Sequence, residues 1–160
     1  MLTSGNPFIM TLYSCFQNKE HLFFVMEYIS GGNLKEQLHE VQFFSEKWAK
    51  FYTAEIVLAV QFLHQHGILH WDLKLENVLV GSDGHCKMAD FGLSKLRLLH
   101  HCKTRTKCGT PFCMAPEVVK NFLYGQGVDW WLVGVMMFEM MTGHPPFHYD
   151  DGEDTDDDNS

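Results

Sequence analysis

The sequence predicts an α+β fold in which short strand hairpins accompany two long helices. Three observations support this prediction. Residues 10–27 contain two strand-like runs joined by a polar turn. Residues 45–66 and residues 128–141 are both predominantly apolar and long enough for helices of several turns.

The strands are expected in two antiparallel hairpins. The runs 10–16 and 21–27 are rich in strand formers, and Gln-Asn-Lys-Glu between them is typical of a turn. The second hairpin combines residues 77–80 with residues 85–89, which flank the turn sequence Gly-Ser-Asp-Gly.

Capping residues mark the ends of the first helices. Asn33 followed by Glu36 matches a capping box and starts a short helix that ends at about Glu40. Ser45 is the expected N-cap of a long helix that Gly67 stops. The apolar residues of this helix cover most of its circumference, so we expect it to be buried centrally. They include Trp48, Phe51, Tyr52, Ile56, Val57, Leu58, Val60, Phe62 and Leu63.

The remaining elements follow from turn residues. Residues 93–127 are rich in loop formers, and we expect loops there. Gly143 and the following Pro145-Pro146 pair end the apolar helix 128–141. The chain has no internal repeat at a period of 20–50 residues.

Composition and charge limit the function classes. A chain of 160 residues with 46% hydrophobic and 20% charged residues is typical of one globular domain. The net charge is -8, but seven acids lie in residues 150–158, which leaves 13 acids against 12 Lys and Arg. This nearly neutral body has no basic footprint for nucleic acid. The best apolar run, Trp130 to Met141, has 12 residues and is too short for a membrane span.

The cysteines and the N-terminus favour a cytoplasmic protein. The first residues have neither the basic region nor the apolar region of a signal peptide. Five cysteines are an odd number, and free thiols in a reducing compartment are the simplest interpretation. The spacing of Cys102, Cys108 and Cys113 lacks the short Cys-x2-Cys pair that is usual in structural zinc sites.

Three short motifs carry the chemistry. They are His70-Trp71-Asp72-Leu73-Lys74-Leu75-Glu76-Asn77, then Asp90-Phe91-Gly92, then Ala115-Pro116-Glu117 with Gly109-Thr110-Pro111 before it. One such motif alone has little weight, but here all three occur in order, flanked by the expected helices and hairpin. The set resembles the catalytic loop, metal-binding loop and activation segment of eukaryotic protein kinases.

Further stretches narrow the resemblance. Residues 22–28, 83–92, 123–125 and 128–131 are similar to the catalytic domain of novel, eta-type protein kinase C, in the AGC group, and the likeness runs from about Asn6 to Phe147. It implies a protein-kinase-like fold: mostly the helical C-terminal lobe, plus the hinge and the last two strands of the N-terminal lobe. The resemblance divides the chain into a partial kinase domain, residues 1–148, and an acidic, disordered tail, residues 149–160. Within that domain, the N-lobe remnant is 1–28 and the C-lobe is 29–148.

The resemblance implies roles in phosphoryl transfer, which depends on positioning and charge neutralisation. Asp72 would accept or orient the proton of the substrate hydroxyl, and Lys74 would neutralise the transferring phosphoryl group. Asn77 and Asp90 would hold Mg²⁺, a cation that takes oxygen ligands. Thr110 would hydrogen-bond Asp72 and Lys74. Taken singly, the acids and Asn77 are ordinary turn or capping residues, and only the joint pattern favours a functional origin.

The same resemblance implies an ATP site. Met26 is the gatekeeper, the backbone of Glu27 and Ile29 is the adenine-binding hinge, and Leu79 is the floor under the base. Asn33 stands where the family has an acid that contacts the ribose and a substrate arginine. Simple core packing would also account for Met26 and Leu79.

The implied partners are protein substrates with basic residues near the Ser or Thr that is phosphorylated. Glu76 and Glu139 match acids that select such substrates, and Asp129 would hydrogen-bond the backbone of the catalytic loop. Thr106 stands where protein kinase C has its activating phosphate. The sequence predicts no oligomeric state.

Several features depart from the family pattern. The glycine loop, the ATP-binding lysine and the helix with the glutamate partner of that lysine are not in the sequence. Trp71 replaces the arginine of the His-Arg-Asp motif, and Lys107 and Phe112-Cys113 are further substitutions. We therefore expect a serine/threonine kinase catalytic fragment that is inactive by itself. The alternatives are a pseudokinase-like binding module that competes for substrates, and a truncated product without function.

Overall fold

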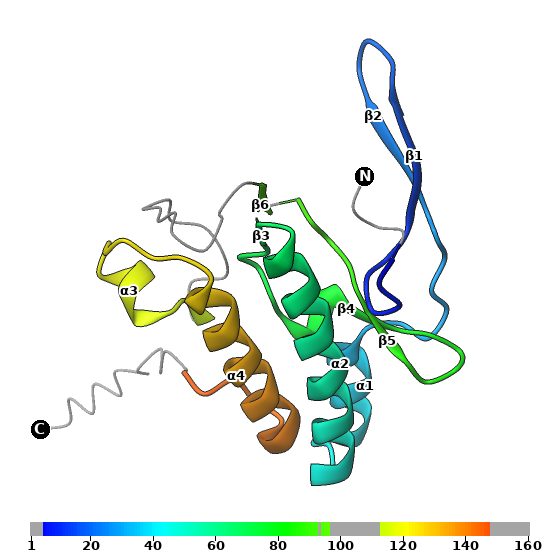
Figure 1. Ribbon diagram of the computed structural model, residues 1–160. Helices are drawn as coiled ribbons and strands as arrows, with labels where there is room; N and C mark the ends of the chain where they lie inside the picture. Colours follow the sequence, from blue (N-terminus) through cyan, green and yellow to red (C-terminus); the bar gives the residue numbers. More distant parts are fainter. Residues whose placement is uncertain (1–4, 93, 97–112, 148–160) are drawn as a thin grey trace, which may run out of the picture.

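A computed structural model of the chain describes residues 5–92, 94–96 and 113–147. It confirms the α+β class: the described residues form helices and three two-stranded antiparallel sheets. Figure 1 shows the two long helices, α2 and α4, side by side, with the hairpin β1–β2 projecting away from them. No helix in the described ranges is long and apolar enough to cross a membrane.

The first hairpin pairs β1 (Leu12–Gln17) with β2 (Leu22–Met26). The predicted strands are confirmed, with ends shifted by one or two residues and a register irregularity between Leu12 and Ser14. All side chains of β2 are exposed, because no further described strand pairs with this hairpin. Phe16 and Phe23 stack across the strands with ring centroids 5.0 Å apart.

Helix α1 (Leu34–Val41) begins at the predicted capping box. The Asn33 side chain accepts a hydrogen bond from the Glu36 N–H at 2.9 Å, and the Glu36 carboxylate accepts the Asn33 N–H at 3.2 Å. Leu34 and Leu38 are the buried residues of this helix. The capping box is therefore confirmed, and it fixes where the chain turns after Gly31-Gly32.

Helix α2 (Glu46–Gln65) has the predicted N-cap, Ser45, whose hydroxyl accepts from the Trp48 N–H at 3.4 Å. Gly67 follows the helix with a φ of 70°, as a stop residue requires. The expected central burial of α2 is wrong for part of its apolar surface, since Trp48 and Leu58 are 50% and 48% exposed. Only one face of the helix packs, against α4, the strand β5 (Cys86–Met88) and the strand β3 (Ile68–Leu69).

The second predicted hairpin is confirmed as β4 (Val78–Val80) paired with β5, in the register Leu79 opposite Lys87. Four short elements were not predicted, and two of them, the strand Lys95–Leu96 and the helix Pro116–Val119, lie in residues 93–127, where only loops were expected. A 3₁₀-helix over Leu75–Asn77 leads into β4, and β3 pairs with β6 (Lys95–Leu96). These pairings place the segment 70–77 between β3 and β4, against the residues that follow β5.

Helices α3 (Pro116–Val119) and α4 (Gly127–Thr142) complete the described structure. Gly143 ends α4 in the left-handed conformation, with φ of 85°, as predicted from its sequence. The Phe44 N–H donates to the Met140 carbonyl at 2.7 Å, so the connection between α1 and α2 lies against the last turn of α4. A Cβ atom at Gly143 would collide with the Gln42 carbonyl, which favours glycine at this close approach.

The main core lies between α1, α2, α4 and the β4–β5 hairpin. Its most buried residues include Leu34, Ile56, Val60, Leu75, Val78, Met88, Met136 and Met140. A second cluster joins the end of β3 and the residues after it to α3 and α4, and consists of Leu69, Trp71, Ala115, Val118, Tyr124 and Val128.

Candidate functional site

The segment 70–77 is held in place by a buried carboxylate on α4. Asp129 has no exposed surface, and its Oδ2 accepts the His70 N–H at 3.0 Å while its Oδ1 accepts the Trp71 N–H at 3.0 Å. His64 of α2 lies on the same carboxylate, with Nε2 2.8 Å from Oδ2. The expectation that Asp129 binds the loop backbone is confirmed, whereas the contact from His64 was not predicted.

Three predicted catalytic residues meet on this segment. The Lys74 ammonium lies 3.0 Å from Oδ2 of Asp72, and the Asn77 amide donates to the Asp72 carbonyl at 2.8 Å and to Oδ2 at 3.3 Å. The hydrogen bond to Asp72 raises the pKa of Lys74 despite partial burial, and the charges of Asp72, Glu76 and Asp90 add to this rise. Lys74 is therefore a firmly protonated cation surrounded by carboxylates.

Asp90 lies just beyond β5 in a left-handed turn. Its φ is 56°, and its Oδ1 accepts the Gly92 N–H at 3.1 Å. His70 connects this turn to the catalytic segment, because its Nε2 lies 3.3 Å from the Ala89 carbonyl and its ring packs 5.2 Å from that of Phe91. Burial lowers the pKa of His70, so the ring is held neutral in this contact.

The side chains near Asp72 suit a hard cation. Asn77 uses its amide nitrogen on Asp72, which leaves Oδ1 without a hydrogen bond among the described residues. Asp90 uses one carboxylate oxygen on Gly92 and keeps the other. Carboxylate and amide oxygens are the ligands that Mg²⁺ takes in proteins, so this donor set fits that ion.

The predicted hinge is fixed by Glu27. Its Oε2 lies 2.6 Å from the Lys87 ammonium on β5, and its Oε1 accepts the Thr11 N–H at 2.5 Å. Burial acts to raise the pKa of Glu27, but the hydrogen bonds from Lys87 and Thr11 together lower it below its ordinary value. Sequence reasoning assigned only the backbone of Glu27; its pairing with Lys87, 60 residues away, has no local signal.

The hinge continues along β4. The Gly31 N–H donates to the Val80 carbonyl and the Val80 N–H donates to the Gly32 carbonyl, both at 2.9 Å. An isolated bridge pairs Asn33 with Leu79, the predicted floor of the ATP site, which is half-buried. The backbone therefore brings Asn33 and Leu79 together, although the Asn33 oxygen is already used as a helix cap.

Met26 and Ile29, the other predicted nucleotide-site residues, differ in their surroundings. Met26 ends β2 opposite Leu12 and is 51% exposed, so packing in the core does not explain it. Ile29 is half-buried and lines, with Tyr28 and Lys87, a hollow of about 490 Å³ between the hinge and the β4–β5 turn.

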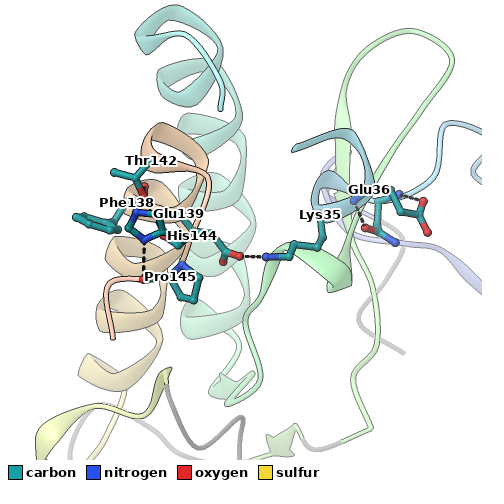
Figure 2. Close-up of polar contacts among 8 residues, drawn as sticks. Lys35, Glu36, Phe138, Glu139, Thr142, His144 and Pro145 are labelled. Carbon is teal, nitrogen blue, oxygen red and sulfur yellow. Dashed lines mark hydrogen bonds and ion pairs between the residues drawn. The ribbon is translucent and has the colours of Figure 1, made fainter. Parts of the chain in front are cut away.

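The two predicted substrate acids have different environments. Glu76 is exposed, whereas Glu139 on α4 is 6% exposed and forms an ion pair with Lys35 of α1 (Figure 2). Burial raises the pKa of the Cys113 thiol, and the carboxylates of Glu139, Glu76 and Asp72 raise it further while Lys35 lowers it. The charges of both predicted substrate acids and of Asp72 thus act on the pKa of the Cys113 thiol.

Trp71 lies in the apolar cluster beside α3. Its ring is 7% exposed and meets Tyr124 edge to face, with centroids 6.1 Å apart. Thr110 and Thr106, predicted as a catalytic and a regulatory residue, lie outside the described residues. Of the cysteines considered for zinc, only Cys113 is described, and it is a free thiol.

Comparison with known proteins agrees with this geometry. The family model of the protein kinase domain matches residues 1–159. Protein kinase C epsilon type from Oryctolagus cuniculus and Protein kinase C from Drosophila melanogaster are each 49% identical over 153 residues. Protein kinase C eta type from Homo sapiens is 46% identical over 153 residues. These matches cover 96% of this chain and 21–22% of the relatives, so the chain spans about a fifth of their length. The predicted resemblance to protein kinase C is confirmed, and the chain belongs to the protein kinase family.

Proposed function

We propose that this chain provides the catalytic-loop and hinge part of an ATP-dependent serine/threonine kinase whose substrates have basic residues near the phosphorylated side chain. The observation that carries the proposal is the contact of Asp72 with both Lys74 and Asn77, beside the Asp90 turn. A protein kinase needs an acid, a cation and oxygen ligands for a metal within reach of one phosphoryl group. This proposal is supported by the contacts among Asp72, Lys74 and Asn77 within one segment, and by the bond from the Ala89 N–H to the Asn77 carbonyl next to the Asp90 turn.

Asp72 is proposed to orient the substrate hydroxyl and accept its proton. Its carboxylate is held by Lys74 and Asn77, which prevents it from rotating away from the incoming hydroxyl. The pKa of Lys74 is raised, so this residue keeps its charge and can stabilise negative charge on the transferring group. Mg²⁺ held by Asn77 and Asp90 would supply charge neutralisation at the phosphates.

The nucleotide is proposed to bind along the hinge, with Leu79 under the base and Asn33 near the ribose. The support is geometric: backbone bonds from Gly31 and Gly32 tie the hinge to β4, and the Glu27–Lys87 ion pair fixes its other end. Met26 and Ile29 lie on either side of Glu27 and Tyr28 in the chain. The described hinge therefore has a fixed backbone that could present an N–H and a carbonyl to a planar base.

We further propose that these 160 residues transfer phosphate weakly or not at all without a glycine loop and an ATP-binding lysine. Both the lysine and its glutamate partner act in the protein kinase mechanism, and each 1.36 kcal/mol of lost transition-state stabilisation costs about tenfold in rate. A cytoplasmic location is also part of the proposal. It is supported by the three described cysteines, which are free thiols.

A second candidate is a binding module of the pseudokinase kind, and the position of Trp71 favours it. An indole has one donor and no charge, so it cannot pair with a phosphate as a guanidinium would. Its burial among Tyr124 and other apolar side chains shows packing where the family has a charged contact. Such a module would bind nucleotide or peptide without turnover.

One experiment separates these candidates. Binding of Mg·ATP to the 160-residue chain is measured by titration calorimetry, beside a radiolabelled ATP assay with a basic serine peptide. We expect binding that Asp90→Ala abolishes and that Glu46→Ala, which removes an exposed acid in the first turn of α2, leaves intact. Turnover that Asp90→Ala removes would identify an active enzyme; binding without turnover would favour the module. If Mg·ATP does not bind at all, the proposed nucleotide site is wrong.

A further inference from the structure

The ion pair between Lys35 and Glu139 joins two helices that are far apart in the chain. Figure 2 shows the Lys35 side chain extending from α1 toward the Glu139 carboxylate on α4. The two side chains are unlike in their exposure, since 37% of the Lys35 side chain is accessible and 9% of that of Glu139. Within the described residues, Lys35 is the one cation hydrogen-bonded to this carboxylate.

This pair lies in the same region as the proposed phosphotransfer residues. Helix α1, which carries Lys35, packs against the 3₁₀-helix Leu75–Asn77 that follows Asp72 and Lys74. The charges of Glu139, Lys35, Glu76 and Asp72 all act on the pKa of the Cys113 thiol. The Cys113 carbonyl is fixed by the Trp131 indole N–H of α4 at 3.1 Å. A peptide that lies across Asp72 would therefore pass close to Glu139. Whether Glu139 is paired with Lys35 then affects which peptide side chain binds there.

The energetics of the two partners differ. A buried carboxylate without a cation pays a large desolvation cost, so Glu139 requires a positive partner. Lys35 has no such requirement, because its side chain is only partly buried and its flexible stem allows the ammonium to return to water. An incoming guanidinium can make two parallel hydrogen bonds to a carboxylate where an ammonium makes a point contact. Replacing the Lys35 ammonium by a guanidinium thus strengthens the hydrogen bonding of the Glu139 carboxylate. The cost for Lys35 is small, because its ammonium is then hydrated.

We propose that Lys35 determines peptide specificity by occupying Glu139 in the absence of substrate, so that a cationic peptide side chain binds Glu139 only by displacing the Lys35 ammonium. The inference rests on the proposed function, since it assumes that peptides bind beside Asp72. Its consequence is a reduced preference for basic peptides: the gain from a guanidinium at Glu139 is offset by the loss of the internal ion pair. Glu76, which is exposed, keeps its full attraction for a second cation.

The test compares peptide binding to wild type and to Lys35→Met in the presence of Mg·ATP, by titration calorimetry. The probes are serine peptides with one arginine, placed in turn at each position around the serine, and their isosteric, uncharged citrulline counterparts. At one arginine position, we expect Lys35→Met to bind the arginine peptide about five- to tenfold more tightly, with no change for the citrulline peptide. The double variant Lys35→Met/Glu139→Gln should lose this gain.

Matched controls keep the test decisive. Lys50→Met removes another ion-paired lysine, on α2 with Glu46, and should change neither peptide. If Lys35→Met fails to fold, Lys35→Arg serves instead; it should weaken arginine-peptide binding a few-fold, because it holds Glu139 with two hydrogen bonds. Unchanged affinity in every Lys35 variant, or no peptide binding while Mg·ATP binds, would overturn the inference and leave the proposed function standing. Loss of Mg·ATP binding as well would contradict both the inference and the proposed function.

Discussion

Asp129 holds Trp71 in a left-handed backbone conformation: Oδ1 of the buried acid accepts the Trp71 N–H at 3.0 Å while the φ of Trp71 is 71°. This conformation costs a residue with a Cβ atom about 1–2 kcal/mol of free energy, and Trp71, unlike glycine, has such an atom. The same carboxylate accepts the neighbouring N–H of His70. The shape of the proposed catalytic loop therefore depends on a side chain that lies more than 50 residues away in the chain.

Asp129→Ala should destabilise the protein strongly. Two buried N–H groups would lose their acceptor, and each such loss costs about 1–3 kcal/mol, so we expect the free energy of unfolding to fall by about 3 kcal/mol or more. Urea unfolding followed by circular dichroism measures this. Asp83→Ala, which removes a carboxylate acting as acceptor for the His85 N–H on an exposed turn, should cost less than about 1 kcal/mol. Equal effects of the two variants would contradict the proposed role of Asp129.

Trp71→Arg should be less stable than Trp71→Phe. The indole packs with Ala115, Val118 and Tyr124, and a guanidinium placed there without an acid would be desolvated. We expect a loss of about 2–5 kcal/mol for arginine and about 1–2 kcal/mol for phenylalanine, from paired urea titrations. If arginine is tolerated as well as tryptophan, an anion from outside the described residues faces position 71. In that case the predicted phosphorylation site at Thr106 would gain support.

The contact between His85 and Glu55 predicts a pH dependence of stability. The hydrogen bond and the charge of the buried Glu55 raise the pKa of His85 above its ordinary value of about 6.5. The raised pKa in the folded state gives stability that is complete below about pH 6.5 and lost as the pH rises through the folded pKa. From pH 6 to pH 9, the urea midpoint of wild type should therefore fall more than that of His85→Gln.

Glu55→Gln serves as the control for that experiment. Glutamine keeps an acceptor for the Cys86 N–H, which Glu55 accepts at 2.8 Å, but it has no charge to hold the proton of His85. Its pH profile should be as flat as that of His85→Gln over the same range. A profile that stays as steep as wild type would mean that other groups cause the pH dependence.

The β1–β2 hairpin should exchange its amide hydrogens faster than the helical core. A two-stranded hairpin is marginal in water, and the side chains of β2 are exposed along its whole length. We expect residues 22–26 to exchange well before residues 56–63 of α2 in hydrogen-exchange mass spectrometry. Strong protection of residues 22–26 in a sample shown to be monomeric would contradict this expectation. Protection that increases with protein concentration would indicate association through the exposed strand edge.

Local sequence patterns correctly predicted the helices whose ends are marked by capping or stop residues. The Asn33–Glu36 capping box, the Ser45 cap and the Gly143 stop are all within a few residues of the backbone groups that they satisfy, and all three are confirmed. The strands β3 and β6 were missed because two residues are too few to show alternation. The short helix α3 was missed inside a segment rich in loop-forming residues.

Contacts within the candidate site follow from local sequence only where residues are close in the chain, and the one distant contact that was predicted, from Asp129 to the backbone of His70 and Trp71, came from the resemblance to protein kinases. Asp72, Lys74 and Asn77 lie within six positions, and their contacts follow from one loop. Lys35 with Glu139, Glu27 with Lys87 and His64 with Asp129 join residues 60 to 104 positions apart. No spacing rule connects such pairs, because the packing of whole helices and strands decides them.

The contact of the α1–α2 connection with the end of α4 also bears on how the chain is made. Phe44 needs the carbonyl of Met140 for its N–H, and Gln42 lies against Gly143, about 100 residues later. At about 5–20 residues per second, a ribosome delivers that partner at least about 5 s after the connection has been synthesised. During this time the Phe44 N–H lacks its acceptor, although the rings of Phe44, Trp48 and Phe51 can already pack against Tyr52. The connection between α1 and α2 therefore cannot reach its final arrangement before helix α4 has been synthesised.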